Sequence, residues 1–106
     1  MDTATDEELQ TVFASRVLEG PGGNVMMRIY CPRKIGDDWA SRCAVFDEER
    51  SLLWSMDFWG VDSVQALQLA LFGLRARFGG EDSEFWFLGE RGTGILETII
   101  PNKGTL

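Results

Sequence analysis

The spacing of apolar residues changes once along this chain, and that change constrains the fold more than any other feature. Upstream of residue 61, apolar and polar residues alternate, which is typical of strands with one buried face. From residue 61 to residue 78, apolar residues recur every three or four positions, as along one stripe of an amphipathic helix. The stripe consists of Val64, Leu67, Leu71, Leu74 and Phe78. The sequence therefore predicts a sheet followed by one long helix.

Four segments before the helix alternate as strands do, and turn residues separate them. We predict these strands at residues 9–18, 25–31, 39–46 and 51–58. The segment between the first two contains three glycines and a proline, a composition that favours a hairpin turn centred on Gly22. The charged run before the fourth strand has the length of a second hairpin loop. We expect the four strands to form an antiparallel meander.

Residues at both ends of the helical stripe are those that start and stop helices. Asp62 or Ser63 can accept hydrogen bonds from the first turn, and the cations Arg75 and Arg77 suit the negative end of a helix. The glycines at residues 79–80 favour a stop. The helix is therefore the best-defined element in the sequence.

Residues after the helix predict two short strands, at 84–88 and 94–100, around a glycine-rich turn. The predicted fold class is α+β, an antiparallel sheet in the order β-β-β-β-α-β-β with one amphipathic helix packed on one face. Residues 1–106 are expected to form a single domain, in which residues 1–8 are frayed. We expect the helical stripe to pack on Val17, Ile29, Val45, Trp54 and Phe87.

Composition excludes several classes of function. The chain has 106 residues, with 10 Lys and Arg against 17 Asp and Glu, and its net charge of −7 disfavours nucleic acid as a partner. It contains no histidine, so catalytic and metal sites that depend on histidine are excluded. The two cysteines, Cys31 and Cys43, are expected to be reduced thiols on the helix-facing side of adjacent strands. We therefore expect no enzymatic activity, no cofactor and no metal.

We expect neither a secretory signal nor a membrane-spanning segment in this sequence. The acidic residues 2–10 lack the basic and apolar regions of a secretory signal. The most apolar window, residues 61–78, contains too many polar groups to span a bilayer. The expected location is the cytoplasm, without contact with a membrane.

Three arginines are expected to form a row on the face of the sheet opposite the helix. A turn centred on Gly22 pairs Arg16 with Arg28, and the next hairpin places Arg42 beside Arg28. Such a row, with Tyr30 nearby, could bind a carboxylate or another anion through arginine forks. Asp57 is also expected nearby. The alternative is a solvated face on which the arginines pair with neighbouring acids.

Two acidic clusters and one tryptophan are candidate contacts for a protein partner. The first cluster lies between the third and fourth strands, and the second follows the helix. The clusters are Asp47, Glu48 and Glu49, and Glu81, Asp82 and Glu84. Trp59 lies at the corner between strand and helix, and exposed tryptophans are common in binding hot spots. The alternative is that the acidic clusters are solvated loops and that the tryptophan packs in the core.

The start of the helix carries a resemblance to a known family. Residues 60–71, with the sequence GVDSVQALQLAL, occur together with Arg16, the pair Cys31–Pro32 and the spacing Trp39-x-x-x-Cys43. Over about residues 11–88 this pattern resembles a family of short uncharacterised bacterial proteins, a domain of unknown function. The resemblance implies a bacterial cytoplasmic α+β domain and brings no catalytic residues with it.

These observations favour a non-enzymatic protein-binding module. Its most concrete form is an immunity-type inhibitor, a monomer or homodimer whose acidic surface binds a basic effector. One alternative is a secretion chaperone or assembly subunit that forms a homodimer through a sheet edge. A further alternative is a small-anion binder that uses Arg16, Arg28 and Arg42.

Overall fold

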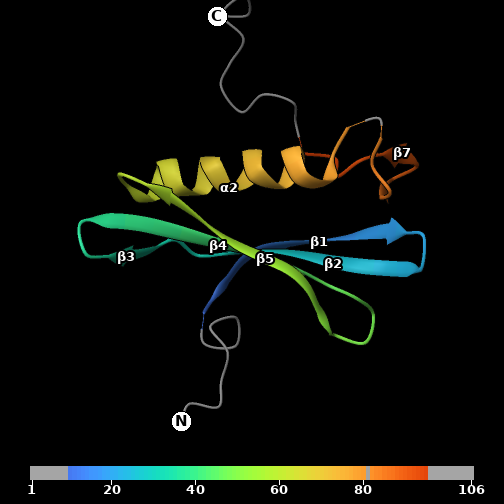
Figure 1. Cartoon of the computed structure of the whole chain (residues 1–106), viewed down its shortest axis with the longest axis horizontal. Coiled ribbons are helices and arrows are strands. Elements are labelled where there is room, and N and C mark those ends of the chain that lie inside the picture. Colours follow the sequence, from blue (N-terminus) through green and yellow to red (C-terminus); the bar gives the residue numbers. More distant parts are fainter. Residues whose placement is uncertain (1–9, 81, 96–106) are drawn as a thin grey trace, which may run out of the picture.

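One long helix lies over one face of an antiparallel sheet, so the chain has the α+β fold that its sequence predicts (Figure 1). The computed structural model describes residues 10–80 and 82–95 of the chain. Its elements are, in chain order, β1 (Val12–Gly20), β2 (Gly23–Tyr30), β3 (Arg33–Ile35), β4 (Asp38–Phe46), β5 (Leu52–Gly60), α2 (Ser63–Phe78), β6 (Trp86–Phe87) and β7 (Glu90–Arg91).

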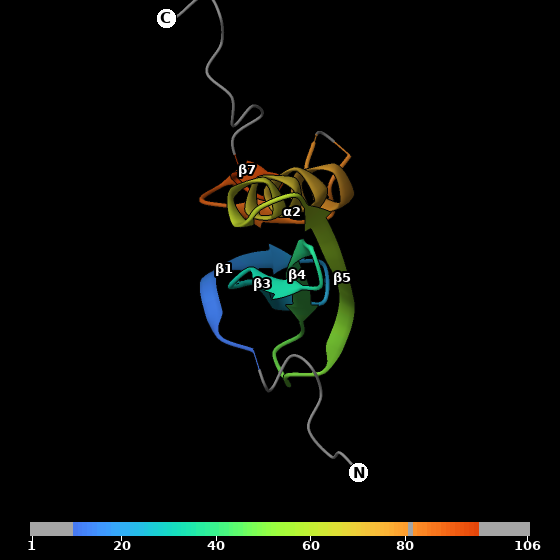
Figure 2. The ribbon, with the colours of Figure 1, turned by 90° about the vertical axis from the view of Figure 1, so that its left-hand side faces the viewer.

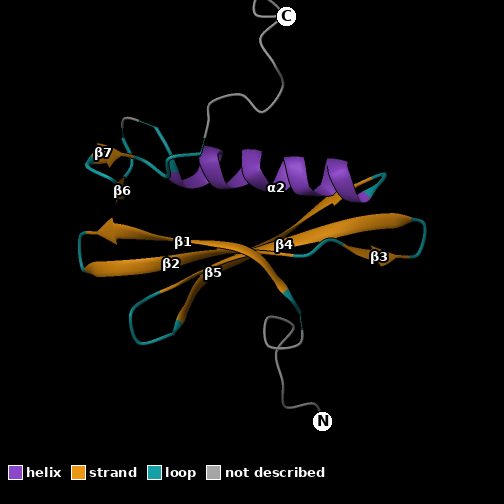
Figure 3. Cartoon of the chain, turned by 180° about the vertical axis from the view of Figure 1, so that it is seen from behind, coloured by secondary structure: helices purple, strands orange, loops and turns teal. Residues whose placement is uncertain are grey.

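The seven strands form one sheet in which β4 is central. Strand β5 pairs with one edge of β4, and β2 and β3 pair in succession with the other edge. Strand β1 continues the sheet beyond β2, and the short β6–β7 hairpin joins β1 through the pair Glu19 and Trp86. The helix packs against β4 and β5, and Figure 3 shows the two layers from behind.

Two of the observed strands differ from the sequence prediction. Strand β3 lies in a segment predicted as a polar loop, and β7 lies within the predicted glycine-rich turn. Each is two or three residues long, which is too short for an alternating pattern to be detected. Gly94 and Ile95, at the start of the last predicted strand, are not in a strand, and the rest of that prediction lies outside the described residues, as does the prediction for residues 1–8.

The register of the first hairpin decides which face each β1 residue occupies. Gly20 pairs with Gly23 across the two-residue turn of Pro21 and Gly22, so Arg16 lies opposite Met27. The predicted register, which pairs Arg16 with Arg28, is therefore wrong by one residue. Because side chains alternate between faces, this shift exchanges the face of each residue from Ala14 to Gly20, up to the register irregularity between Val12 and Ala14.

The helix-covered face of the sheet holds the core. Met27, Ile29, Cys43 and Val45 are buried there beneath the helix. Burial raises the pKa of the Cys43 thiol to about 12, with a smaller contribution from the charge of Asp57. Both cysteines are free, as predicted. We call the other side of the sheet the open face.

The side of the helix that faces the sheet is rotated from the predicted stripe. Ala66, Ala70 and Leu74 are fully buried, whereas Val64 is 62% exposed. Leu67, Leu71 and Phe78 are partly buried against the core, as predicted. The prediction for Val64 is wrong because apolar residues surround most of the helix, and small alanines let it approach the sheet closely. Val17 is likewise 50% exposed on the open face rather than packed under the helix.

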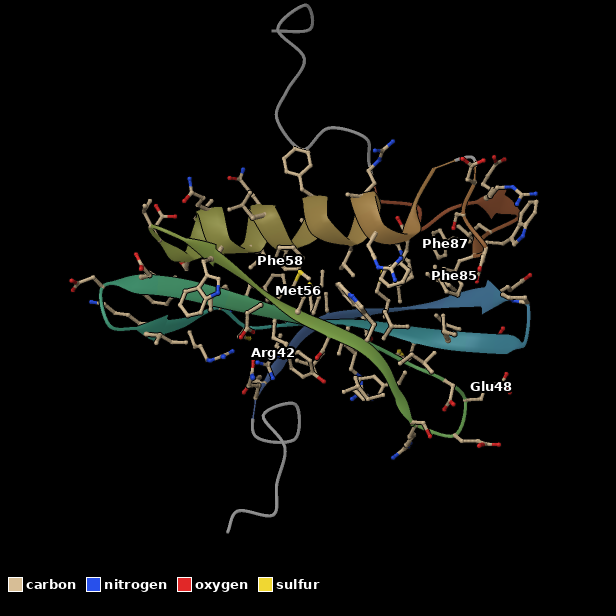
Figure 4. The ribbon with its side chains drawn as sticks, viewed as in Figure 1. Arg42, Glu48, Met56, Phe58, Phe85 and Phe87 are labelled. Carbon is tan, nitrogen blue, oxygen red and sulfur yellow. The ribbon has the colours of Figure 1, made fainter. Side chains whose placement is uncertain are left out.

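Gly73 allows the closest contact between helix and sheet. A Cβ atom at this position would lie 2.1 Å from the ring of Phe58, which points from β5 towards the helix (Figure 4). A side chain there would force the two layers apart, although glycine weakens the interior of a helix. Gly73 therefore allows the helix to pack closely against β5.

The ends of the helix have the predicted caps. Asp62 Oδ1 accepts a hydrogen bond from the backbone N–H of Gln65, at 2.8 Å, and Gln65 Oε1 accepts one from the N–H of Val61, also at 2.8 Å. At the other end, the Gly79 N–H donates to the Arg75 carbonyl at 2.7 Å. No helix among the described residues is both long and apolar enough to cross a membrane.

Candidate functional site

The open face of the sheet is concave. Figure 2 shows β1 and β5 on opposite sides of the sheet, with their first residues curving away from the helix. Between them lies an open-face hollow with a volume of about 610 Å³. Its walls are formed by Val17, Met26, Arg28, Tyr30, Phe46 and Leu52, and the β4–β5 loop adds Asp47, Glu48 and Arg50.

At one end of the open face, Arg42 is paired with a carboxylate. Its Nε and Nη2 atoms donate to the two oxygens of Asp57, each at 2.8 Å. Arg33 Nη2 lies 3.5 Å from the same carboxylate, and Arg33 Nη1 donates to Gln10 Oε1 at 2.8 Å. We call the three charged residues the Asp57 clamp. The clamp joins β3, β4 and β5, so Arg42 has a structural partner rather than a ligand.

The clamp changes the acidity of Asp57. The hydrogen bonds from Arg42 are the main cause that lowers the pKa of this carboxyl below its usual value. Burial opposes the effect, and the charges of Arg42 and Arg33 add to it. The carboxylate is therefore ionised at neutral pH and holds both arginines.

On the strand next to Arg42, Arg28 lies on the wall of the hollow. Its Cζ atom is 5.0 Å from the centre of the Phe46 ring. Within the described part of the chain, its guanidinium has no hydrogen-bond or ion-pair partner. It lies opposite Ala44, two positions along β4 from Arg42, so the two arginines share a face but belong to different surroundings.

Tyr30 lies next to Arg28 on the same face of β2. Its side chain is 0% exposed, and its hydroxyl has no hydrogen-bond partner among the described residues. A buried hydroxyl without a partner is unfavourable and uncommon in proteins. The sequence pattern placed Tyr30 near the arginines, but alternation indicates only the face of a residue and not its depth.

Arg16 is separated from the other two arginines by the sheet. It lies on the helix-covered side, where its Nη1 donates to the Thr93 carbonyl at 3.1 Å and its Cζ lies 3.9 Å from the centre of the Phe87 ring. The predicted row of Arg16, Arg28 and Arg42 is therefore wrong. Of these three arginines, only Arg28 lines the open-face hollow.

The structure brings most of the two acidic clusters together. Asp47, Glu48, Glu49 and Glu84 line one groove of about 330 Å³ beside the β1–β2 turn, which we call the acidic groove. Among the residues that the structure describes, no basic side chain lines it. Asp82 is exposed but outside the groove, and Glu81 lies outside the described residues.

Two of these carboxylates also shape the loops around the groove. Asp47 Oδ1 accepts hydrogen bonds from the N–H groups of Glu49, at 2.9 Å, and Ser51, at 2.8 Å. Glu48 Oε2 accepts one from the Asn24 N–H at 3.0 Å and so links the β4–β5 loop to the β1–β2 turn (Figure 4). Glu49 and Glu84 have no such role in the described structure and are exposed.

Trp59 lies far from the acidic groove. It is 50% exposed and pairs with Ala40 near the last residue of β5, whereas the groove is lined by Leu53, near the first residue of that strand. About six residues of extended chain, roughly 20 Å, separate the two. The structure therefore does not combine Trp59 with the acidic clusters in one site.

Among the described residues, no cluster of three or more metal-ligating side chains is present. The chain matches the model of a protein family described as a domain of unknown function, DUF6968, over residues 14–95. This match confirms the resemblance seen in the sequence. No curated protein and no solved structure matches the chain.

Proposed function

The chain belongs to the DUF6968 family, and we propose that it is a non-enzymatic module that binds a basic protein through its acidic groove. The observation that carries the proposal is the groove itself. Carboxylates that are far apart in the sequence, at residues 47–49 and at residue 84, line one concave surface, and no described basic residue is among those that line it. Lysine and arginine side chains of a partner would complement this surface.

The charge of the whole chain supports the same partner. A net charge of −7 attracts a basic protein at long range and accelerates its association. The form of this function that we propose is inhibition of a basic effector, as immunity proteins act. Association is then expected to slow steeply as salt is added, while dissociation changes little.

The test is binding of a fluorescein-labelled nona-arginine peptide, measured by anisotropy at low salt. The double variant Glu49→Gln/Glu84→Gln removes the two groove carboxylates that have no structural hydrogen bond. The double variant Asp37→Asn/Asp38→Asn removes the same charge from the exposed β3–β4 turn at the other end of the sheet. We expect the first variant to weaken binding about fivefold and the second less than about twofold. Equal losses would show that net charge alone attracts the peptide, and the proposal would fail.

A second candidate function is assembly through a sheet edge, as in a homodimeric subunit or secretion chaperone. On its outer edge β1 pairs with other described residues only at Glu19, and Phe13 and Val17 beside this edge are 56% and 50% exposed. Unpaired strand edges are templates for another chain. Light scattering after gel filtration measures the oligomeric state and so tests this assembly. If the wild type is a dimer, Val17→Lys should convert it to a monomer. A wild type that stays monomeric at high concentration would exclude assembly through this edge.

A further inference from the structure

The open-face hollow is built differently from the acidic groove. Five of its eleven lining residues have apolar side chains, namely Val17, Val25, Met26, Phe46 and Leu52, and Tyr30 adds an aromatic ring. Its volume of about 610 Å³ falls within the range of small-molecule sites. A hollow of this kind favours a ligand with an apolar body.

Arg28 provides one positive charge on the wall of this hollow. Its guanidinium stacks near the Phe46 ring and has no carboxylate partner within the described part of the chain. This contrasts with Arg42, whose fork is filled by Asp57. The planar fork of Arg28 can therefore accept one carboxylate in a bidentate manner.

Tyr30 provides an independent polar group at the same place. Its hydroxyl is fully buried, has no partner among the described residues, and belongs to a side chain that lines the hollow. Tyr30 is two residues from Arg28 on the same face of β2, so the two side chains emerge about 7 Å apart. A carboxylate bound between them would give the hydroxyl an acceptor.

We propose that the open-face hollow binds a monocarboxylate with an apolar body, such as a medium-chain fatty acid. Arg28 pairs with the carboxylate, the Tyr30 hydroxyl donates to it, and the apolar walls hold the chain. Because the hydroxyl has almost no exposed surface in the structure, binding includes a small side-chain movement near Tyr30. Two basic and two acidic side chains line the hollow, Arg28 and Arg50 against Asp47 and Glu48, so their charges balance and a singly charged carboxylate is favoured over a doubly charged phosphate.

The test uses decanoate as the probe and the full chain at pH 7. Backbone amide shifts in a ¹H–¹⁵N NMR titration report both the dissociation constant and the place of binding. Decanol and decyltrimethylammonium have the same apolar chain with a neutral and a positive head. We expect decanoate to shift amides of β2 and β4 around the hollow, decanol to bind about tenfold more weakly, and the cation not to bind there.

Two substitutions separate the head-group contacts from the apolar contacts. Arg28→Gln should weaken decanoate binding at least about tenfold, and Arg28→Lys, which keeps the charge but loses the fork, should weaken it less. Tyr30→Phe should weaken it about tenfold without lowering the melting temperature, because only a hydroxyl without a partner is removed. Arg77→Gln, an equal charge change on the exposed side of the helix, is the control and should leave binding unchanged.

Three results would overturn the proposal. Equal binding of decanol and decanoate would show an apolar surface without a carboxylate site. Amide shifts confined to the helix or the acidic groove would place the ligand elsewhere. Unchanged affinity in Tyr30→Phe, together with a lower melting temperature, would show that the hydroxyl serves stability through water and not a ligand.

Discussion

Arg28 and Arg42 lie on neighbouring strands and on the same face of the sheet, yet within the described structure only Arg42 of the two has a carboxylate partner. Arg42 lies directly opposite Asp57 in the β4–β5 pair, and both side chains are largely buried. Arg28 lies between Ser15 and Ala44, neither of which can accept its charge. The comparison teaches that the cross-strand neighbour, and not the residue type, decides whether an arginine holds the fold together or is available to a ligand.

Among substitutions that test this comparison, removal of the Asp57 carboxylate should have the largest effect on the free energy of unfolding. Asp57→Ala leaves Arg42 and Arg33 without their partner in a partly buried place, and we expect the free energy of unfolding to fall by about 3 kcal/mol. Arg28→Gln should change it by less than about 0.5 kcal/mol, since no pair is broken. Urea denaturation measures both, and similar losses would contradict the distinction between the two arginines.

The clamp should also make stability depend on pH. The folded-state pKa of Asp57 is below its unfolded value, so its contribution is fully present above the unfolded pKa, near 4, and is lost as pH falls through the folded pKa. The stability difference between the wild type and Asp57→Asn should therefore narrow from pH 6 towards pH 2. Denaturation at several pH values measures it, and a difference that stays constant across this range would show that the clamp is not ionic.

A smaller effect concerns two buried hydroxyls near these arginines. Ser41 Oγ donates to the Tyr30 carbonyl at 3.1 Å, whereas the Tyr30 hydroxyl has no described partner. We expect Ser41→Ala to lower the free energy of unfolding by about 1 kcal/mol and Tyr30→Phe to leave it unchanged or raise it slightly. Thermal or urea unfolding distinguishes them, and an equal cost for both would mean that the tyrosine hydroxyl is satisfied.

Much of the fold could be predicted because its elements are long. The helix from Ser63 to Phe78 and its Asp62 cap follow from periodicity and capping chemistry, and the faces of β2 and β4 follow from alternation. The rotation of the helix about its own axis could not be predicted from the apolar stripe, because Val64 and the outward-facing residues around it are apolar as well. Packing against the sheet selects the small residues Ala66 and Ala70 instead.

The candidate site was predicted only in part, because the sequence pattern gives residue types and their order but not the register or the depth of a side chain. Arg28 and the two acidic clusters were identified from residue type and position in the chain. The grouping of Arg16 with Arg28 failed because a segment with three glycines allows more than one turn, and neighbouring choices differ by one residue in register. The burial of the Tyr30 hydroxyl depends on how the sheet curves, which no local pattern contains.

The length of the turn at Pro21 and Gly22 sets the register of β1, and the register determines which β1 side chains lie on each face of the sheet. One residue inserted there would exchange the faces of β1, which would move Arg16 to the side of Arg28 and Val17 beneath the helix. The open face would then carry two adjacent positive charges and would suit a dianion. Pro21 and Gly22 do not line the open-face hollow, yet their turn sets which charges a ligand in that hollow would meet.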